Sequence, residues 1–232
     1  MKTAILIDGG FFLKRYPKLF KNGHQHDACI KADNMYRMAM RHLWQWNGRI
    51  KPNLYRILYY DCKPFTLTAH HPITGKVIDF SKTAVAKERL RFFEELKKKR
   101  KVALRLGMLK PTKNWVINPR KIKSLLKGEI TCKDLGEHDI KYDLNQKGVD
   151  IKIGLDIASL SLQKVVDQII LISGDMDFVP AAKMARRNGI DFILDPMWNP
   201  IDPSLHEHID GLNSTSENPQ KKFPAGKYPY IV

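Results

Sequence analysis

Short apolar runs alternate along the chain with segments whose apolar residues recur every three or four positions. Runs of Ile, Leu, Val and Ala that stop at polar residues predict strands buried on both faces of a sheet. They cover residues 3–7, 54–60, 102–109, 169–172 and 191–194. The periodic segments predict helices over residues 11–20, 33–46, 83–99, 150–160 and 178–188. Because strands and helices alternate, we predict a three-layer α/β/α sandwich with a mostly parallel central sheet.

Capping residues suggest where these helices begin and end. Asp33 is the expected cap of the second helix, and the Asn-Gly pair at 47–48 is its expected end. Ser81 or Thr83 is expected to open the third helix. We expect its inner face to carry Ala86, Leu90, Phe93 and Leu96.

The pattern predicts one large domain and a tail. Residues 1–195 form the predicted domain, with a basic insertion around 110–143 that includes a further predicted strand at 115–117. Residues 63–80 contain prolines, a glycine and a His-His pair, so we expect a loop there. Residues 196–232 are rich in Pro, Asn, Ser and Gly, and we expect this tail to be either docked on the core or disordered.

Charge is the feature of the composition that bears most on function. The chain has 40 Lys and Arg against 24 Asp and Glu, a net charge of +16. Such an excess favours a polyanionic partner, and nucleic acid fits best because neutralised phosphates release counterions. Composition alone does not exclude an anionic membrane surface.

The remaining bulk features predict a cytoplasmic protein. The three cysteines are isolated, which predicts reduced thiols and not a zinc site or a disulfide framework. The chain opens on a core strand without a signal-peptide pattern, and no run approaches the roughly 20 apolar residues of a membrane span.

Acidic residues follow several of the predicted strands, and two of these strands carry the strongest signal. Asp8 follows the first and precedes Gly-Gly, and Asp175 and Asp177 follow a later one in the segment SGDMD. Ligands of open α/β sheets gather at the carboxyl ends of such strands. Carboxylates brought together there repel one another unless a cation lies among them, so we predict a divalent-metal site. Each acid alone also fits a structural role, since Asp150 and Asp177 open helices and could cap them.

Three segments together resemble a known family. They are ILIDGG near the start, KGVDIKIGLD in the middle and ILISGDMDFVPAAKMAR later. Over roughly residues 1–195 they resemble the NYN domains, in the LabA-like branch of the PIN-like nuclease superfamily. The resemblance implies a PIN-like, Rossmann-like fold and a metal-dependent ribonuclease whose acids bind Mg²⁺ or Mn²⁺.

The resemblance also assigns residues. Catalytic and metal-binding roles fall on Asp8, Asp150, Asp175 and Asp177. A supporting role beside them falls on Ser173 by the same motif. Two further supporting candidates come from position: Asp61 ends the neighbouring predicted strand, and Asp156 lies about 240° around a helix from Asp150, so both cannot face one ion and Asp156 is a second choice. At one position the chain differs, since many PIN-like domains carry Asn or Ser where Phe11 stands.

Basic residues complete the hypothesis. Those expected to contact nucleic acid are Lys147, Lys97, Lys98, Lys99, Arg100 and Lys101. Trp115 or Tyr59 could stack a base. We therefore hypothesise phosphodiester hydrolysis within single-stranded RNA, with RNA favoured over DNA, no membrane partner and a homodimer as one possible assembly.

Several alternatives compete with this hypothesis. A non-catalytic RNA-binding regulator of the same fold would explain Phe11. A Toprim-type site needs a glutamate after its first strand, where this chain has Asp8. A haloacid-dehalogenase-like phosphatase needs a second acid two residues after the first, where this chain has Gly10. The absence of a P-loop motif argues against an NTPase.

Overall fold

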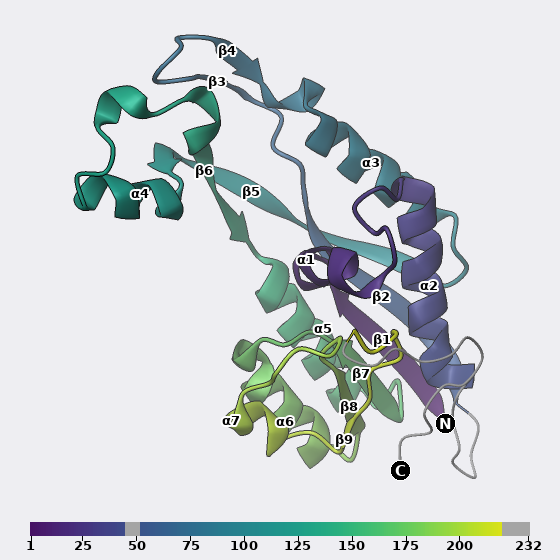
Figure 1. Cartoon of the computed structure of the whole chain (residues 1–232). Helices are drawn as coiled ribbons and strands as arrows, with labels where there is room; N and C mark the ends of the chain where they lie inside the picture. The colour runs from purple at the N-terminus through teal and green to yellow at the C-terminus, as the bar shows by residue number, and fades with distance from the viewer. Residues whose placement is uncertain (45–51, 220–232) are drawn as a thin grey trace. The chain divides into compact units, whose positions relative to one another are not determined.

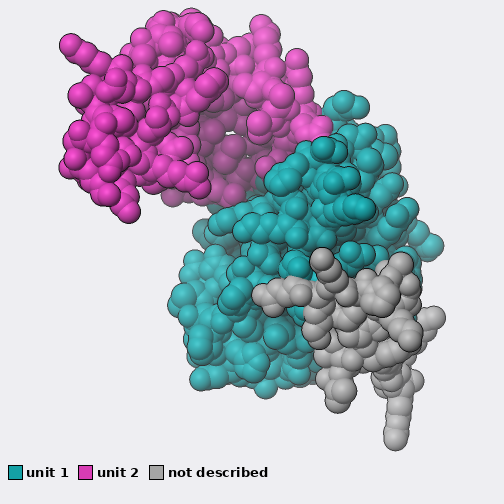
Figure 2. Space-filling view, viewed as in Figure 1, with its two compact units in different colours: residues 1–61, 91–106, 148–232 teal, residues 62–90, 107–147 magenta. Residues whose placement is uncertain are grey.

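The computed structural model describes residues 1–44 and 52–219, which divide into two compact units (Figure 2). Unit 1 contains residues 1–61, 91–106 and 148–232, and unit 2 contains residues 62–90 and 107–147. The predicted helix end at 46–48 and the last 13 residues of the predicted tail, 220–232, lie outside the described residues.

A sheet with strand order β6-β5-β2-β1-β7-β8-β9 organises the chain (Figure 1). Its strands are β1 Lys2–Asp8, β2 Asn53–Lys63, β5 Val102–Ile117, β6 Ile140–Lys147, β7 Gln168–Ile172, β8 Asp191–Asp195 and β9 Gly211–Leu212. β1 lies parallel to β2 and β7, and β8 lies parallel to β7 and β9. Among the pairings described within this sheet, only that of β6 with β5 is antiparallel. The predicted α/β fold with a mostly parallel sheet is confirmed.

Helices connect the strands of unit 1. They are α1 Gly9–Leu19, α2 Ala28–Trp44, α3 Ala84–Lys97, α5 Val149–Leu162, α6 Val179–Arg187 and the short α7 Pro203–His206. A 3-10 turn, η4 (Met176–Phe178), precedes α6. α3 crosses from unit 2 into unit 1 at Arg91.

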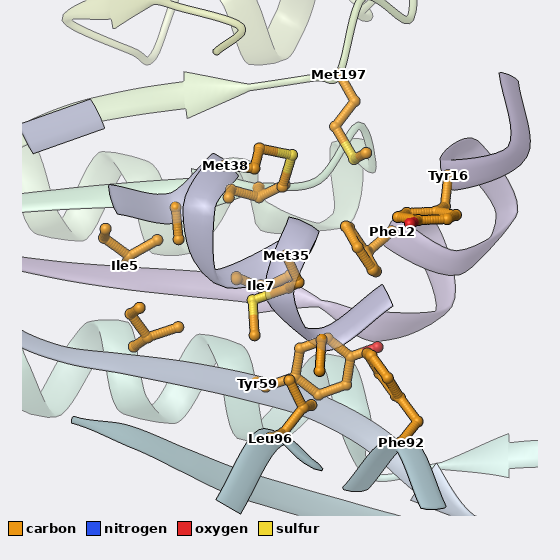
Figure 3. Close-up of a cluster of buried hydrophobic side chains, with 14 of the residues drawn as sticks. Ile5, Ile7, Phe12, Tyr16, Met35, Met38, Tyr59, Phe92, Leu96 and Met197 are labelled. Atoms are coloured by element: carbon orange, nitrogen blue, oxygen red, sulfur yellow. The ribbon is translucent and has the colours of Figure 1, made fainter. Parts of the chain in front are cut away.

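Alternate residues of the central strands pack on opposite faces of the sheet. Ile5, Ile7 and Tyr59 join a buried cluster with residues of α1, α2 and α3, including Phe12 and Met35 (Figure 3). Ala4 and Leu6 point to the other face and are also fully buried. Both faces of β1 are therefore buried, as expected for a central parallel strand.

Unit 2 contains more regular structure than the sequence predicted. The predicted loop at 63–80 contains an antiparallel pair, β3 (Thr68–His70) and β4 (Val77–Asp79), followed by η1 (Phe80–Lys82). The two predicted strands at 102–109 and 115–117 are a single strand, β5. β6 pairs with its second half, and α4 (Pro119–Leu126), η2 (Cys132–Asp134) and η3 (Glu137–Asp139) lie between the two strands in sequence.

Two details of the predicted helices were wrong. α2 begins at Ala28 and not after Asp33, because Asp27 accepts a hydrogen bond from the Ile30 amide at 2.9 Å and acts as the cap. Asp33 instead forms an ion pair with Lys99. In α3, Leu90 is 46% exposed, because Phe92, Phe93 and Leu96 form the buried face.

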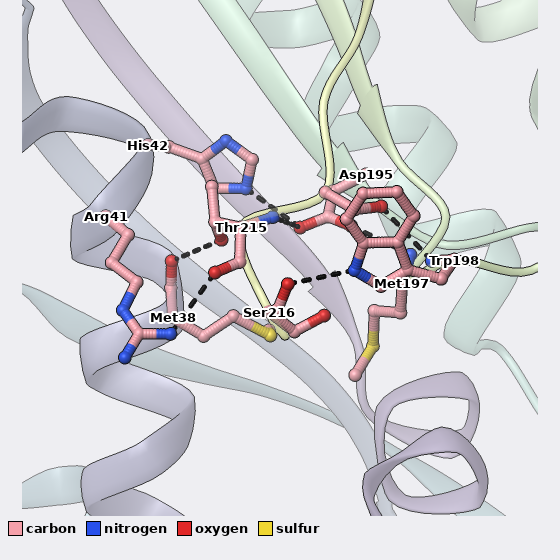
Figure 4. A network of polar contacts seen from close by, with 9 residues as sticks. Met38, Arg41, His42, Asp195, Met197, Trp198, Thr215 and Ser216 are labelled. Carbon is pink, nitrogen blue, oxygen red and sulfur yellow. Dashed lines mark hydrogen bonds and ion pairs between the residues drawn. The ribbon is translucent and has the colours of Figure 1, made fainter. Parts of the chain in front are cut away.

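A buried polar network fixes the segment that follows β8 (Figure 4). Asp195 ends β8, and its carboxylate accepts from the Met197 amide at 2.8 Å and lies 3.0 Å from Nε2 of His42. Thr215 reaches α2 through its hydroxyl, which donates to the Met38 carbonyl at 2.9 Å. These contacts hold residues 196–216 against α2 and β8.

The described residues contain no helix long and apolar enough to cross a membrane.

The first residue of α1, Gly9, lies so close to β2 that there is no space for a side chain. A Cβ at Gly9 would lie 2.5 Å from the Tyr60 carbonyl oxygen and 2.6 Å from the Tyr59 ring. Gly9→Ala should therefore lower the free energy of unfolding by roughly 1–3 kcal/mol, the usual cost of overpacking. Urea unfolding followed by circular dichroism measures this difference.

Gly154 provides the matched control, because it is also helical and a Cβ there would meet nothing within 4 Å. Gly154→Ala should leave stability unchanged or raise it by up to about 1 kcal/mol through helix propensity. Equal effects of the two substitutions would contradict the packing explanation.

Candidate metal and phosphodiester site

Asp8 lies at the junction of β1 and α1, where it caps the helix. Its Oδ1 accepts the Phe11 amide at 3.1 Å. The Ser173 hydroxyl lies 3.4 Å from its Oδ2 and donates to it. Since a carboxylate can accept about four hydrogen bonds, each oxygen keeps room for a further ligand. Asp8 therefore combines a structural role with spare coordinating capacity.

Asp175 and Asp177 follow β7, the strand beside β1. Asp175 caps η4 by accepting the Asp177 amide at 3.0 Å, and both side chains belong to exposed residues. Asp177 was considered as the capping residue, but Asp175 has this role because the 3-10 turn starts at Met176, one residue before Asp177. This leaves the Asp177 carboxylate in the first turn, where the amide dipoles favour a negative charge.

Asp150 lies in the first turn of α5 and is exposed. The capping position before this helix is occupied by Gly148, whose φ of 81° is in the left-handed region that glycine favours. Asp150 is therefore not the capping residue of α5, and its carboxylate is not used for capping.

The four carboxylates interact electrostatically. The pKa of Asp8 is raised to about 6, chiefly by burial and also by the negative charge of Asp150, against the opposing effect of the Phe11 amide. The pKa of Asp150 is also raised, first by burial and then by the charges of Asp175 and Asp177. Among the described residues, no Lys or Arg forms an ion pair with any of the four. Their mutual repulsion is thus uncompensated by a side-chain cation.

The chemistry of these donors fits Mg²⁺ or Mn²⁺. Both ions prefer carboxylate oxygens, and Mg²⁺ is usually bound through one or two carboxylates while it keeps several waters. In the part of the chain that the structure describes, no three His, Cys, Asp or Glu side chains form a group that could hold an ion directly. The arrangement is compatible with an ion held by one or two of the acids and by water.

The predicted supporting residues divide between the two faces of the sheet. Ser173 contacts Asp8, as described above. Asp156 accepts a hydrogen bond from the Tyr60 hydroxyl at 2.8 Å, and its Oδ2 lies 3.1 Å from Nε of Arg105. Asp61 is buried beside the Tyr59 hydroxyl, at 3.5 Å, on the face of β2 opposite to that of Tyr60.

Phe11 packs against the turn that carries Asp175. A Cβ at Gly174 would lie 3.0 Å from the Phe11 ring, so glycine allows the ring and the turn to approach closely. The position where many PIN-like domains have a polar side chain thus contributes an apolar contact to the edge of this site.

Most of the basic run at 97–101 has local partners. Lys97 and Lys98 pair with Glu94 and Glu95 of α3. Lys99 pairs with Asp33, and the Lys101 ammonium donates to the Leu54 carbonyl. Lys147 is the exposed last residue of β6.

Sequence reasoning missed two residues at the carboxyl edge and misjudged a third. Tyr60 and Arg105 were not predicted as site residues, although Arg105 alternates with Leu104 and Leu106 in the sequence of a strand. Tyr59 was considered for base stacking, but its ring is fully buried in the core cluster. Trp115, considered for the same role, packs against His71 and Tyr142 in unit 2.

The raised pKa of Asp8 predicts how stability depends on pH. Because folding raises this pKa from 3.8 to about 6, the stability it contributes is complete below pH 3.8 and is lost as the pH rises through 6. At pH 7 the ionised group therefore costs about 3 kcal/mol. Asp8→Asn keeps a capping oxygen and removes this cost. In EDTA, urea unfolding should show the variant more stable than wild type at pH 7.5, with little difference at pH 3.5. A variant that is less stable at pH 7.5 would contradict the prediction.

Comparisons with known proteins identify the family. The model of the NYN domain matches residues 76–198, which are 123 of the 232 residues and include Asp150, Asp175 and Asp177. No curated protein matches the chain. The solved structures similar to it include a protein of unknown function from Vibrio parahaemolyticus, with 14% identity, 91% of this chain and 90% of that chain covered, and a TM-score of 0.44. Another is a noncanonic maltogenic α-amylase from Thermotoga neapolitana, with 10% identity, 90% of this chain and 48% of that chain covered, and a TM-score of 0.21. The family match and the mostly parallel α/β fold agree, and the chain belongs to the NYN domain family, within the PIN-like nuclease superfamily.

Proposed function

We propose that this protein is a metal-dependent ribonuclease that hydrolyses phosphodiester bonds within single-stranded RNA. Asp8, Asp150, Asp175 and Asp177 would hold Mg²⁺ or Mn²⁺, one or two of them in direct contact with the ion and the others through bound water. The observation that carries the proposal is that Asp8, at the end of β1, is hydrogen-bonded to Ser173, which leads from the neighbouring parallel strand β7 into the turn with Asp175 and Asp177. The charges of nearby acids also raise the pKa of Asp8 and of Asp150. Perturbed acids clustered in this way are typical of functional sites.

A divalent ion held there would lower the pKa of a bound water and offset charge on the scissile phosphate. The chain's own residues would fix the geometry. The Phe11 amide and the Ser173 hydroxyl orient the two oxygens of Asp8. Asp175 is held by its bond to the Asp177 amide. These contacts fix the orientation of Asp8 and Asp175, as a precise binding site requires.

The net charge of +16 supports a polyanionic substrate. Lys147, Arg100 and the lysines at 97–99 would add to the positive field around the chain. Because most lysines of the run pair with local acids, we expect them to attract RNA at long range and to contribute little to specific binding. The cytoplasmic location, the LabA-like branch and the possible homodimer stay predictions.

A second candidate is an RNA-binding regulator of the same fold that does not cleave. The packing of Phe11 on Gly174 favours it, because an apolar ring stands where a polar helper is usual. Metal-dependent cleavage separates the two candidates.

Cleavage of RNA is the first test. Wild-type protein with Mn²⁺ should cut a 5′-labelled single-stranded RNA at internal positions, as read on a denaturing gel. Asp175→Asn should reduce the rate by at least about 100-fold, the scale for loss of a group that stabilises charge in the transition state. Asp167→Asn is the matched control, since Asp167 precedes the other end of β7 and is exposed.

The control variant should cut at the wild-type rate. RNA binding without metal-stimulated cutting would instead select the regulator, and equal losses in the two variants would exclude a specific role for Asp175.

Binding of the ion itself gives a test independent of activity. An ion that binds only the folded state raises the midpoint of thermal unfolding, by about 2.7 kcal/mol of stability at 100 times its Kd. Mn²⁺ at pH 7.5 should therefore raise the Tm of wild type and of Asp167→Asn, and should raise it much less in a variant with both Asp8→Asn and Asp175→Asn. An identical rise in all three proteins would place the ion elsewhere.

A further inference from the structure

A polar row crosses the sheet beside the acidic site. Asp8 of β1 pairs in register with Tyr60 of β2, and the Ser173 hydroxyl, just after β7, contacts Asp8 on its other side. β5 follows β2 in the sheet. Between β1 and β2, the Asn53 amide donates to the Met1 carbonyl, and Asn53 pairs with the next residue, Lys2. In the same way the Ile57 amide of β2 donates to the Lys101 carbonyl, which pairs Ile57 with Val102 of β5. Three residues further along both strands, this register places Arg105 beside Tyr60.

The side chains of this row face α5. Tyr59 and Ile7 belong to the core cluster on the opposite face, so Tyr60 and Asp8 point the other way. Leu104 and Leu106 pack against the same cluster, which turns Arg105 towards α5 as well. Asp156 of α5 confirms this, because it contacts both Tyr60 and Arg105.

The orientation of Arg105 is fixed by Asp156, which is itself held by Tyr60. Its Nε lies 3.1 Å from Oδ2 of Asp156, and the hydroxyl of the fully buried Tyr60 donates to that same oxygen at 2.8 Å. A guanidinium has five N–H donors, so four remain for another partner. Half of the Arg105 side chain is exposed. An ordinary surface ion pair contributes little to stability, but a buried tyrosine that fixes the carboxylate makes this arginine a preorganised donor.

The distance to the acids suits a polynucleotide. β5 lies two strands from β1, or about 10 Å between backbones at the usual strand spacing. A chain of RNA with its scissile phosphate at the acids would thus present a neighbouring phosphate to this edge of the sheet. Arginine binds phosphate oxygens with two parallel hydrogen bonds.

We propose that Arg105 binds a phosphate of the RNA backbone next to the one that is cut, and that Asp156 and Tyr60 are its positioning residues. This inference rests on the proposed function of the acidic site. It assigns Asp156 to the orientation of a phosphate-binding arginine and not to the support of a metal ion.

Salt dependence of RNA binding tests the contact without cleavage. Fluorescence anisotropy with a labelled single-stranded RNA 12-mer, in EDTA, gives the observed binding constant over a range of KCl concentrations. Arg105→Gln should weaken binding and reduce the slope of log Kobs against log[KCl] by about 0.7, the value for one phosphate contact on a single strand. Arg105→Lys should retain the slope, since the charge remains.

Arg186→Gln is the matched control. Arg186 also places its Nε on an aspartate, Asp210 at 2.8 Å, and it belongs to the same unit, near the amino end of β8. It should keep the wild-type slope. An equal change of slope in Arg105→Gln and Arg186→Gln would overturn the contact, because both would then reflect net charge alone.

Asp156→Ala tests the positioning role by the sign of its effect. Removal of a carboxylate from a basic protein should tighten RNA binding if only net charge matters. If Asp156 orients Arg105, binding should weaken by at least about twofold, with circular dichroism showing an intact fold. Tighter or unchanged binding would overturn the positioning role.

These outcomes separate the inference from the proposed function. Wild type that cuts RNA with Mn²⁺, beside an Arg105→Gln slope equal to that of wild type, would overturn the phosphate contact alone. The predicted slope change in a protein that never cuts RNA would keep the contact and overturn the ribonuclease. Absence of RNA binding would overturn both.

Discussion

Repulsion among carboxylates at the end of a parallel sheet is the interaction on which the account of this protein depends. Parallel strands deliver whatever follows them to the same edge, so Asp8 after β1 and Asp175 after β7 cannot be kept far apart. The fold then adds Asp150 from the start of α5. Burial makes the repulsion costly at Asp8, whose pKa rises to about 6. A protein that keeps such an arrangement gives up stability, and a bound cation would restore it.

One face of the central strands forms the main core, and the other face carries polar residues of the candidate site. On one face Ile7 and Tyr59 pack into the main core with α1, α2 and α3. On the other face Asp8 and Tyr60, their neighbours in sequence, turn towards α5. Since side chains alternate strictly along a strand, a polar group at the edge does not disturb the apolar core one residue away. The α1 helix can start directly at Gly9 because glycine leaves space for the Tyr60 carbonyl.

Much of the fold could be predicted from sequence because central parallel strands have an unambiguous apolar pattern. β1, β7 and β8 were found within one or two residues of their ends. The start of α2 was harder to predict, because Asp27 and Asp33 are both suitable capping residues in the sequence. In the structure Asp27 caps the helix, whereas Asp33 pairs with the distant Lys99. Short strands with mixed residues, such as β3 and β4, lack a sufficient run and were predicted as a loop.

Contacts between residues far apart in the sequence limited how much of the candidate site could be predicted. The apolar runs predicted that Asp8 and Asp175 end neighbouring strands, and their order in the chain supported the family resemblance. The link of Tyr60 and Arg105 through Asp156 joins three elements, of which the first and last contribute residues 96 positions apart, and no local pattern encodes it. The same holds for the network of Asp195, His42 and Thr215 (Figure 4), where partners lie up to 177 residues apart.

The most direct measurement for the central claim is the anomalous diffraction of a crystal soaked in Mn²⁺. We expect an anomalous peak within coordination distance, about 2.0–2.6 Å as for other hard divalent cations, of an oxygen from at least one of Asp8, Asp150, Asp175 and Asp177. A peak held only by other residues, or no peak near these four at saturating Mn²⁺, would contradict it.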